Sequence, residues 1–341
     1  MIEIVAVTVI GIVLATLLFF VRLRRKNQRN RKLLTGTKEG ETLPHTHEWE
    51  LYHNEQAPSQ RIRACLAELH IAYKSHEVRI QTDINNSISK NLMAAVTKFQ
   101  VPLLLHNGRA IYNSRRQISY LVAQHERGAR LLPATAEENT RLEYWLNKLS
   151  VRDENDYSLA GSASGNELFT IALPVMGAVL EQLEAKLLVK IFIFNPFLRK
   201  PLGAATALRA LRALTTLSIL ENPVLTEAFE TAKEIIEDQL DEAERSLKTH
   251  GGPWIIGTTF SQIDIEMMVL LYRLKQVTML DDLLRSRRPN LAIYWDQLVL
   301  RPSYKIALVD HTRPATEAAT EKILATRATN PEFDELFRVN H

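Results

Sequence analysis

The spacing of apolar and polar residues in the first half of the chain predicts an alternation of strands and helices. Trp49 to Tyr52 is typical of a strand, Pro58 to His70 of a helix with one apolar face, and His76 to Ile80 of a second strand. Gln100 to Val122 then predicts two short strands joined by a tight turn, followed by a helix that begins at Ser114. The predicted order is strand, helix, strand, and then strand, strand, helix.

The last of these stretches carries the residues best placed to bind a ligand. Pro102 is the proline most expected to be cis, and it has no backbone N–H, which leaves backbone groups of neighbours such as Val101 free to pair with an extended ligand. Ser114, at the start of the following helix, offers a hydroxyl and unpaired N–H groups that suit a carboxylate. An ordinary hairpin and helix without a ligand is the alternative interpretation.

The second half of the chain predicts helices almost throughout. Glu137 to Leu149 is amphipathic, Asp153 to Asn166 predicts a loop, and Thr226 to His250 repeats apolar residues every three or four positions. Gly251 and Gly252 end this last helix. Its repeat suits a seam in the core of its own domain or a coiled-coil dimer, and the core is favoured because the repeat extends little beyond about three heptads.

A capping box is predicted after the Trp-Ile-Ile-Gly stretch. Ser261 can cap a helix, and Asp264, three residues later, can bond back to it. Phe260 and Ile265 flank the box as a hydrophobic staple. This signal marks a structural element at the start of a buried helix, and a further helix opens at Arg288.

The helical half also contains an apolar insertion, Glu167 to Pro223. Leu168 to Leu180 and Leu187 to Leu198 are strongly apolar, but the charged residues between and within them disfavour a membrane crossing. A helical pair packed on the domain and a pair lying along a membrane surface are both compatible with the pattern. Core packing is favoured, because long apolar helices are usually buried by their own domain.

The amino-terminal segment predicts a transmembrane anchor. Ile2 to Val21 is twenty residues long with Glu3 as its only charge, enough to cross a hydrocarbon core of about 30 Å. A cleaved signal peptide is the alternative, but basic residues before the apolar run and a small-residue cleavage site after it are missing. The basic residues from Arg22 to Lys32 place the rest of the chain on the cytosolic side. Leu33 to His47 predicts a flexible tether.

Composition narrows the classes of function. The 341 residues have a net charge of +3, and the positive excess lies in the basic segment, which does not favour nucleic acid as a partner. Cys65 is the single cysteine, which excludes an internal disulfide and a cysteine-based metal site. It lies on the apolar side of a predicted helix, where a buried packing thiol is favoured over a nucleophile. No metal is expected.

Two stretches resemble glutathione S-transferases. LYHNEQAPSQRIRACLAELHIAYKSHEVRI, from Leu51, resembles the start of their first domain, and VPLLLHNGRAIYNSRRQISYL, from Val101, resembles its glutathione-binding half. The resemblance implies an α/β thioredoxin-like domain followed by an all-α glutathione transferase C-terminal domain, with glutathione as ligand or co-substrate. It assigns Val101 to backbone pairing with glutathione, Pro102 to the cis geometry and Ser114 to the ligand carboxylate.

The chain departs from the family where the catalytic donor is expected. The position that usually carries a hydroxyl or thiol to stabilise the glutathione thiolate is Gln56 or Ala57. Ser59 is the nearest hydroxyl and the candidate catalytic residue, and its alternative role is to satisfy the helix start. Tyr52 is interpreted as a packing residue, and Asn113 replaces the family's Glu. Two functions follow: a glutathione-binding protein with doubtful conjugating activity, or a non-enzymatic adaptor whose insertion binds a partner protein or the membrane surface.

The predicted domains are an anchor (1–23), a basic flank and linker (24–46), the thioredoxin-like domain (47–127), the helical domain (131–311, with the insertion 167–223) and a tail (312–341) that covers or leaves the domain. The insertion and the anchor resemble most the ganglioside-induced differentiation-associated protein 1 group, whose anchor is carboxyl-terminal. The expected location is a membrane crossed once, with the folded domains facing the cytosol. A bacterial inner membrane and an organelle outer membrane are both left open, as are a homodimer and another partner protein.

Overall fold

The structure, a computed structural model, describes residue 22 and residues 42–78, 101–149, 159–160, 166–182, 214–284 and 287–338. The predicted anchor, most of the predicted tether and the apolar stretch from Leu187 to Leu198 lie outside these ranges. Within them, no helix has both the length and the apolar character needed to cross a membrane.

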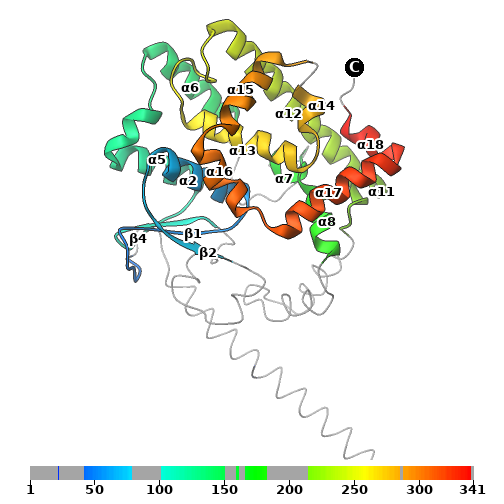
Figure 1. The fold of residues 1–341 in the computed structure, drawn as a ribbon, viewed down its shortest axis with the longest axis horizontal. Coiled ribbons are helices and arrows are strands. Elements are labelled where there is room, and N and C mark those ends of the chain that lie inside the picture. Colours follow the sequence, from blue (N-terminus) through cyan, green and yellow to red (C-terminus); the bar gives the residue numbers. More distant parts are fainter. Residues whose placement is uncertain are drawn as a thin grey trace, which may run out of the picture.

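The first domain contains a four-stranded sheet with two helices packed on one face (Figure 1). Its elements are, in chain order, β1 (Trp49–His53), α2 (Ala57–Glu68), β2 (Lys74–Glu77), β3 (Leu103–His106), β4 (Arg109–Ile111) and α5 (Ser114–Gln124). The strand order is β2-β1-β3-β4, with β1 and β2 parallel and the other neighbours antiparallel. This arrangement confirms the predicted thioredoxin-like domain.

Strand β2 begins earlier than the apolar pattern predicted. The prediction was His76 to Ile80, whereas the strand is Lys74–Glu77, and residues 79 and 80 lie outside the described ranges. Its contacts with β1 are largely polar: the His76 ring stacks on Tyr52 with centroids 4.3 Å apart, and the His76 Nε2 lies 2.8 Å from the Glu50 Oε2. An apolar period cannot reveal a strand of this kind. Tyr52 is buried against His76, as predicted for a packing residue.

Residues 42–47 belong to the folded domain, so the predicted flexible tether is wrong at this end. Thr42 forms an antiparallel bridge with Arg109 on the edge strand β4. The Leu43 side chain is buried, and its N–H donates to the Gly108 carbonyl at 2.7 Å. Gly108 has a φ of +78°, and a Cβ at this position would lie 2.6 Å from the Leu43 carbonyl oxygen. Local composition indicated a linker and could not reveal this order, because the segment is ordered by pairing with a strand edge that lies far away in the sequence.

The second domain is helical throughout its described residues, apart from turns. Its elements are η1 (Glu126–Leu131), α6 (Ala136–Lys148), α7 (Glu167–Thr170), α8 (Leu173–Glu181), α11 (Ser218–Glu221), α12 (Pro223–His250), α13 (Gln262–Gln276), α14 (Leu280–Leu284), α15 (Pro289–Val299), α16 (Pro302–Ala307), η2 (Val309–His311), α17 (Pro314–Thr329) and α18 (Pro331–Phe337). Helix α13 is buried on nearly every side. Because α2 packs on α13 and α16, the two domains share one interface.

The apolar repeat of α12 lies in the core of its own domain. The side chains of Phe229 and Leu240 are fully buried there. The helix begins three residues before the predicted start because the Asn222 Oδ1 accepts a hydrogen bond from a backbone N–H of its first turn and caps it. Gly251, with a φ of +64°, ends the helix as predicted. The structure therefore confirms a core seam.

The described part of the insertion packs into the helical domain. Helices α7 and α11 contact α12, and α8 contacts α17. Leu173 and Ala178 of α8 are buried, which confirms core packing for the first apolar stretch. The Glu181 carboxylate accepts hydrogen bonds from the Thr216 N–H at 3.0 Å and from the Thr216 hydroxyl at 2.9 Å. The end of α8 and the residues just before α11 therefore lie close together.

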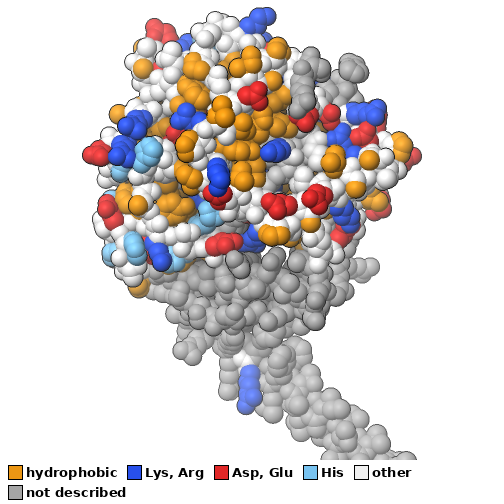
Figure 2. Space-filling view, in the orientation of Figure 1, with side chains coloured by type: hydrophobic (Ala, Val, Ile, Leu, Met, Phe, Trp, Pro, Cys, Tyr) orange, Lys and Arg blue, Asp and Glu red, His pale blue; other side chains and the backbone are white. Residues whose placement is uncertain are grey.

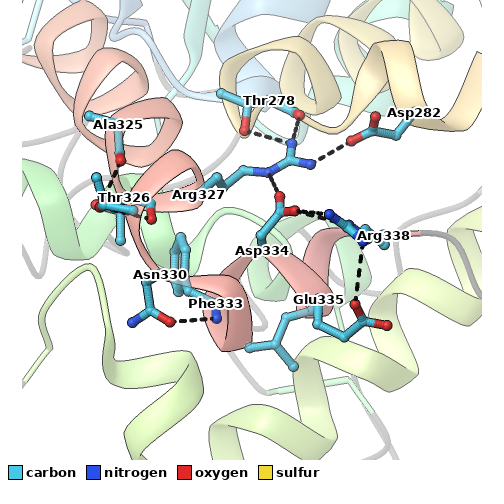
Figure 3. A network of polar contacts seen from close by, with 12 residues as sticks. Thr278, Asp282, Ala325, Thr326, Arg327, Asn330, Phe333, Asp334, Glu335 and Arg338 are labelled. Atoms are coloured by element: carbon cyan, nitrogen blue, oxygen red, sulfur yellow. Dashed lines mark hydrogen bonds and ion pairs between the residues drawn. The ribbon is translucent and has the colours of Figure 1, made fainter.

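The polar tail forms two helices that cover the domain. Helix α17 packs on α8, and Phe333 and Phe337 of α18 are fully buried. Arg327 joins the tail to the domain (Figure 3). Its Nη2 donates to the Asp282 Oδ2 at 2.7 Å, its Nε donates to the Asp334 Oδ1 at 2.7 Å, and its Nη1 donates to the Thr278 carbonyl. Of the two predicted alternatives, the tail covers the domain.

Hydrophobic side chains gather on the face over α15 and α16 in Figure 2. On these helices, or directly after them, Ile293, Leu300 and Ile306 are 59%, 82% and 45% exposed. This face belongs to the helical domain and contains none of the predicted ligand-binding residues.

Candidate glutathione site

Val101 and Pro102 lie immediately before β3 and are buried. The peptide bond between them is cis, as predicted. The pairing of β1 with β3 ends at Tyr52 and Leu103, so the Val101 backbone lies beyond the ladder. Among the described residues, none forms a hydrogen bond with the Val101 N–H or carbonyl. These two backbone groups have the placement that pairing with an extended ligand requires.

Ser114 is the first residue of α5 and is fully buried. Asn113 precedes it with a φ of +68°, and the Asn113 Oδ1 accepts a hydrogen bond from the Arg116 N–H at 3.2 Å. Where the family has Glu, this chain therefore uses Asn to cap the helix. The positive end of the helix dipole lies at Ser114, which favours a carboxylate there.

Ser59, the candidate thiolate donor, lies in the first turn of α2 and is fully buried. Its Oγ donates to the Asn54 Oδ1 at 3.2 Å and accepts a hydrogen bond from the Asn54 N–H at 3.2 Å. The Asn54 Oδ1 also accepts from the Gln56 N–H at 2.9 Å. The Ser59 hydroxyl thus orders the loop between β1 and α2. To donate to a thiolate, this hydroxyl has to give up its hydrogen bond to the Asn54 Oδ1 and donate to the sulfur instead.

The first domain matches a known family. Residues 51–130 match the family model described as Glutathione S-transferase, N-terminal domain, and this range contains Ser59, Val101, Pro102 and Ser114. The first domain is therefore similar to the N-terminal domain of glutathione S-transferases. Glutathione S-transferase TCHQD of Arabidopsis thaliana is 25% identical to the chain over 257 residues, which are 75% of this chain and 88% of that relative.

Solved structures show the same fold. The beta-etherase LigF of Sphingobium sp. strain SYK-6 superposes with a TM-score of 0.55 at 16% sequence identity, over 77% of this chain and all of the other. Glutathione S-transferase-I bound with the ligand lactoylglutathione superposes with a TM-score of 0.51 at 16% identity, over 77% of this chain and 99% of the other. At these identities the likeness establishes the two-domain fold.

The tail lies over the loop between β1 and α2. The Glu55 Oε2 accepts hydrogen bonds from the Arg313 N–H at 3.2 Å and from the Thr316 hydroxyl at 2.9 Å. Arg313 also donates to the Glu77 Oε1 at 3.2 Å. The polar composition of the tail gave no sign of this contact, because it depends on the fold of the whole helical domain.

A buried polar cluster at the domain interface lies directly beside the same loop. The Arg63 side chain donates to the His53 Nδ1 at 3.0 Å, to the Asn54 carbonyl at 2.5 Å and to the Ala307 carbonyl at 2.8 Å. The His53 Nε2 lies 2.7 Å from the Ser75 Oγ. Because Nδ1 accepts from a guanidinium, His53 is neutral with its proton on Nε2. The sequence indicated this cluster only through an Arg-Ile-Arg stretch in the helix that follows β1.

The His53 cluster predicts a loss of stability in acid. Burial, and next the charge of Arg63, lower the pKa of His53 to about 3 from 6.5. The unfolded chain therefore binds a proton that the folded chain excludes between about pH 6.5 and pH 3. The free energy of unfolding should fall by about 3 kcal/mol through His53 as the pH drops from about 7 to about 4. Urea unfolding as a function of pH measures this change.

A His53→Gln variant is the control for this prediction, because glutamine does not titrate. Its unfolding free energy should lack the His53 contribution to the acid slope. The comparison is needed because Asp264 acts in the opposite sense: burial raises its pKa to about 6 from 3.8, so its contribution to stability decreases as the pH rises through that window. An equal acid slope in both proteins would show that His53 is not the titrating group.

The capping box predicted at Ser261 and Asp264 is present and extends further than the motif. The Asp264 Oδ2 accepts from the Ser261 N–H at 2.7 Å and from its hydroxyl at 3.1 Å. The Oδ1 accepts from the Ile255 N–H at 3.0 Å and from the Tyr294 hydroxyl at 2.9 Å. Through these four donors the Asp264 carboxylate joins α13, α15 and the loop before α13, which is a structural role.

The remaining candidates lie outside the candidate glutathione site. Cys65 is fully buried, and burial raises the pKa of its thiol, so the predicted packing role is confirmed. In the described ranges, no three His, Cys, Asp or Glu side chains are grouped as metal ligands. An open groove between α6 and α12 is lined by Lys148, Asp238, Asp241, Glu242, Glu244 and Arg245. It contains none of the predicted site residues.

Proposed function

We propose that this glutathione S-transferase-like protein binds glutathione, or a similar thiol peptide, beside Pro102. The observation that carries the proposal is the pair of Val101 backbone groups, which lie beyond the end of the ladder and have no partner among the described residues. The adjoining Pro102 carbonyl accepts a hydrogen bond from Gln117 of α5. In this proposal the ligand backbone pairs with Val101, and its carboxylate accepts a hydrogen bond from Ser114. The family model over residues 51–130 and the lactoylglutathione bound to a protein of the same fold support this choice of ligand.

Ser114→Ala is expected to weaken glutathione binding by about ten- to a hundredfold, because a hydrogen bond to a charged carboxylate contributes about 1.5 to 3 kcal/mol. Calorimetric titration of the full chain measures the effect. Ser119→Ala is the matched control, since Ser119 is exposed on the same helix and its hydroxyl donates to the Arg115 carbonyl. Equal affinity in the two variants would remove Ser114 from the proposed site.

Ser59 is the proposed thiolate donor if the protein is an enzyme. Ultraviolet absorbance of the bound thiolate as a function of pH tests this role. A Ser59→Ala variant that binds glutathione but raises the thiol pKa by about one unit supports donation by the Ser59 hydroxyl. An unchanged thiol pKa would show that the Ser59 hydroxyl is not the thiolate donor and that its role is to bond Asn54.

We also propose that Ile2 to Val21 anchors the protein in a membrane, with the folded domains on the cytosolic side. The length of the apolar run and the basic residues that follow it support this proposal. We further propose that the insertion and the anchor relate the chain to the ganglioside-induced differentiation-associated protein 1 group, although the anchor of that group is carboxyl-terminal. Resistance of the full chain to alkaline extraction from membranes, and its release by deletion of residues 2–21, are the expected results. Extraction of the intact chain would overturn the anchor.

A second candidate is a non-enzymatic adaptor whose insertion binds a partner protein or the membrane surface. The bonds between Ser59 and Asn54 favour it, because they occupy the nearest hydroxyl to the expected donor position. Deleting the whole insertion would remove core residues of α8. The Glu181 to Thr216 bonds show that the described residues on either side of 183–213 lie close together, so a short linker can join them. A variant with a short glycine and serine linker in place of residues 183–213 should fold. Retention of partner recovery by this variant would exclude the adaptor.

A further inference from the structure

The Gln117 side chain lies beneath the two segments that form the proposed glutathione site. Its Nε2 donates to the Pro102 carbonyl at 2.9 Å and to the Ile111 carbonyl at 2.7 Å, and the residue is fully buried. Because both partners are acceptors, the amide nitrogen must face them, which fixes the orientation of the side chain. Its Oε1 is buried and has no hydrogen-bond partner among the described residues.

These two bonds connect backbone that the sheet does not connect. The ladder between β3 and β4 begins at Leu104 and Ile111, and the ladder between β1 and β3 ends at Leu103. Pro102 lies beyond both ladders. One amide therefore links the segment that carries Val101 to the end of the strand that leads into Ser114.

The unpaired oxygen shows that the amide is not fully satisfied at this position. An aliphatic side chain between Ser114, Ile118 and Leu121 on the buried face of α5 would remove the unpaired acceptor, but it would leave the Pro102 and Ile111 carbonyls without their donor. The two donated hydrogen bonds are what glutamine supplies and leucine does not.

We infer that Gln117 is a positioning residue, which fixes Val101 and Pro102 relative to Ile111 and Ser114. This inference deepens the proposed function and rests on it for the identity of the ligand. Gln117 does not contact the ligand itself. It sets the distance between the Val101 backbone groups that pair with the ligand and the Ser114 hydroxyl that donates to the ligand carboxylate.

Two variants of the full chain test the inference. Gln117→Leu keeps the volume and removes both donors, and it should weaken glutathione binding by about tenfold. Gln117→Glu keeps the shape but places a carboxylate against two carbonyl oxygens, so its affinity should be low at about pH 8 and should recover in part at about pH 5.5, when protonation restores one donor. Leucine should show no such recovery. Ile236→Val, in the core of α12, is the control for a general loss of stability.

Amide hydrogen exchange without ligand separates this inference from the proposed function. In Gln117→Leu, exchange should accelerate by about tenfold at residues 103–106 and 111–114, and it should be unchanged in α13. Unchanged exchange in these two segments would overturn the positioning role. If the wild type binds glutathione, the role would also be overturned by a Gln117→Leu variant with unchanged affinity together with a Gln117→Glu variant that shows no recovery at low pH. If the wild type does not bind glutathione, the proposed function fails, and the exchange result alone then supports or overturns positioning by Gln117.

Discussion

Asp264→Ala is expected to lower the free energy of unfolding by about 4 kcal/mol. The substitution removes the capping box and leaves the Ile255 N–H and the Tyr294 hydroxyl buried without a partner, and each of these losses costs about 1 to 3 kcal/mol. Urea unfolding followed by tryptophan fluorescence measures the change.

Two other substitutions make this prediction specific. Asp264→Asn keeps one acceptor oxygen but turns an amide N–H₂ toward donors, so about half of the loss is expected. Asp310→Ala removes a carboxylate that is paired with Lys305 at the exposed surface, and it should cost less than about 0.5 kcal/mol. A loss of similar size at Asp264 and Asp310 would contradict the structural role of the capping box.

Arg63→Met is expected to destabilise the protein by about 4 kcal/mol and to weaken the contact between the two domains. Methionine fills much of the same volume, but it leaves the Ala307 carbonyl, the Asn54 carbonyl and the His53 Nδ1 without their donor. Because α2 packs on α16 at this interface, we expect the single unfolding transition to broaden or to separate into two.

The control for this substitution is Arg245→Met, in which the replaced side chain lies largely in solvent on α12. It should change the free energy of unfolding by less than about 0.5 kcal/mol. Arg63→Lys should fall between the two, since one ammonium cannot reach three acceptors arranged around a planar guanidinium. A loss below about 1 kcal/mol in Arg63→Met would show that the cluster contributes little to the interface.

The sequence predicted the parts of the fold that depend on local pattern. The strand at Trp49, the hairpin around Gly108 and the helix predicted from Thr226 to His250 follow from apolar spacing, turn residues and caps, all of which lie within a few residues of one another. The capping box is of the same kind, because Ser261 and Asp264 are three residues apart. Such signals do not depend on the rest of the fold.

The missed features all depend on contacts between distant residues. Thr42 is ordered by pairing with Arg109, and the Arg63 side chain donates to the Ala307 carbonyl. Gln117 had no local signal beyond a polar side chain three residues after Ser114, on a helix face that the fold buries. The placement of Val101, Pro102 and Ser114 in one hairpin and helix was predictable, whereas the residue that fixes their relative position was not.

The most direct test of the account is whether glutathione pairs with the Val101 backbone. In a protein labelled with ¹⁵N at valine, the Val101 amide signal should shift saturably with millimolar glutathione, and its hydrogen exchange should slow, while the signal of Val269 in the core of α13 stays fixed. A Val101 signal that does not move at saturating millimolar glutathione would contradict the account.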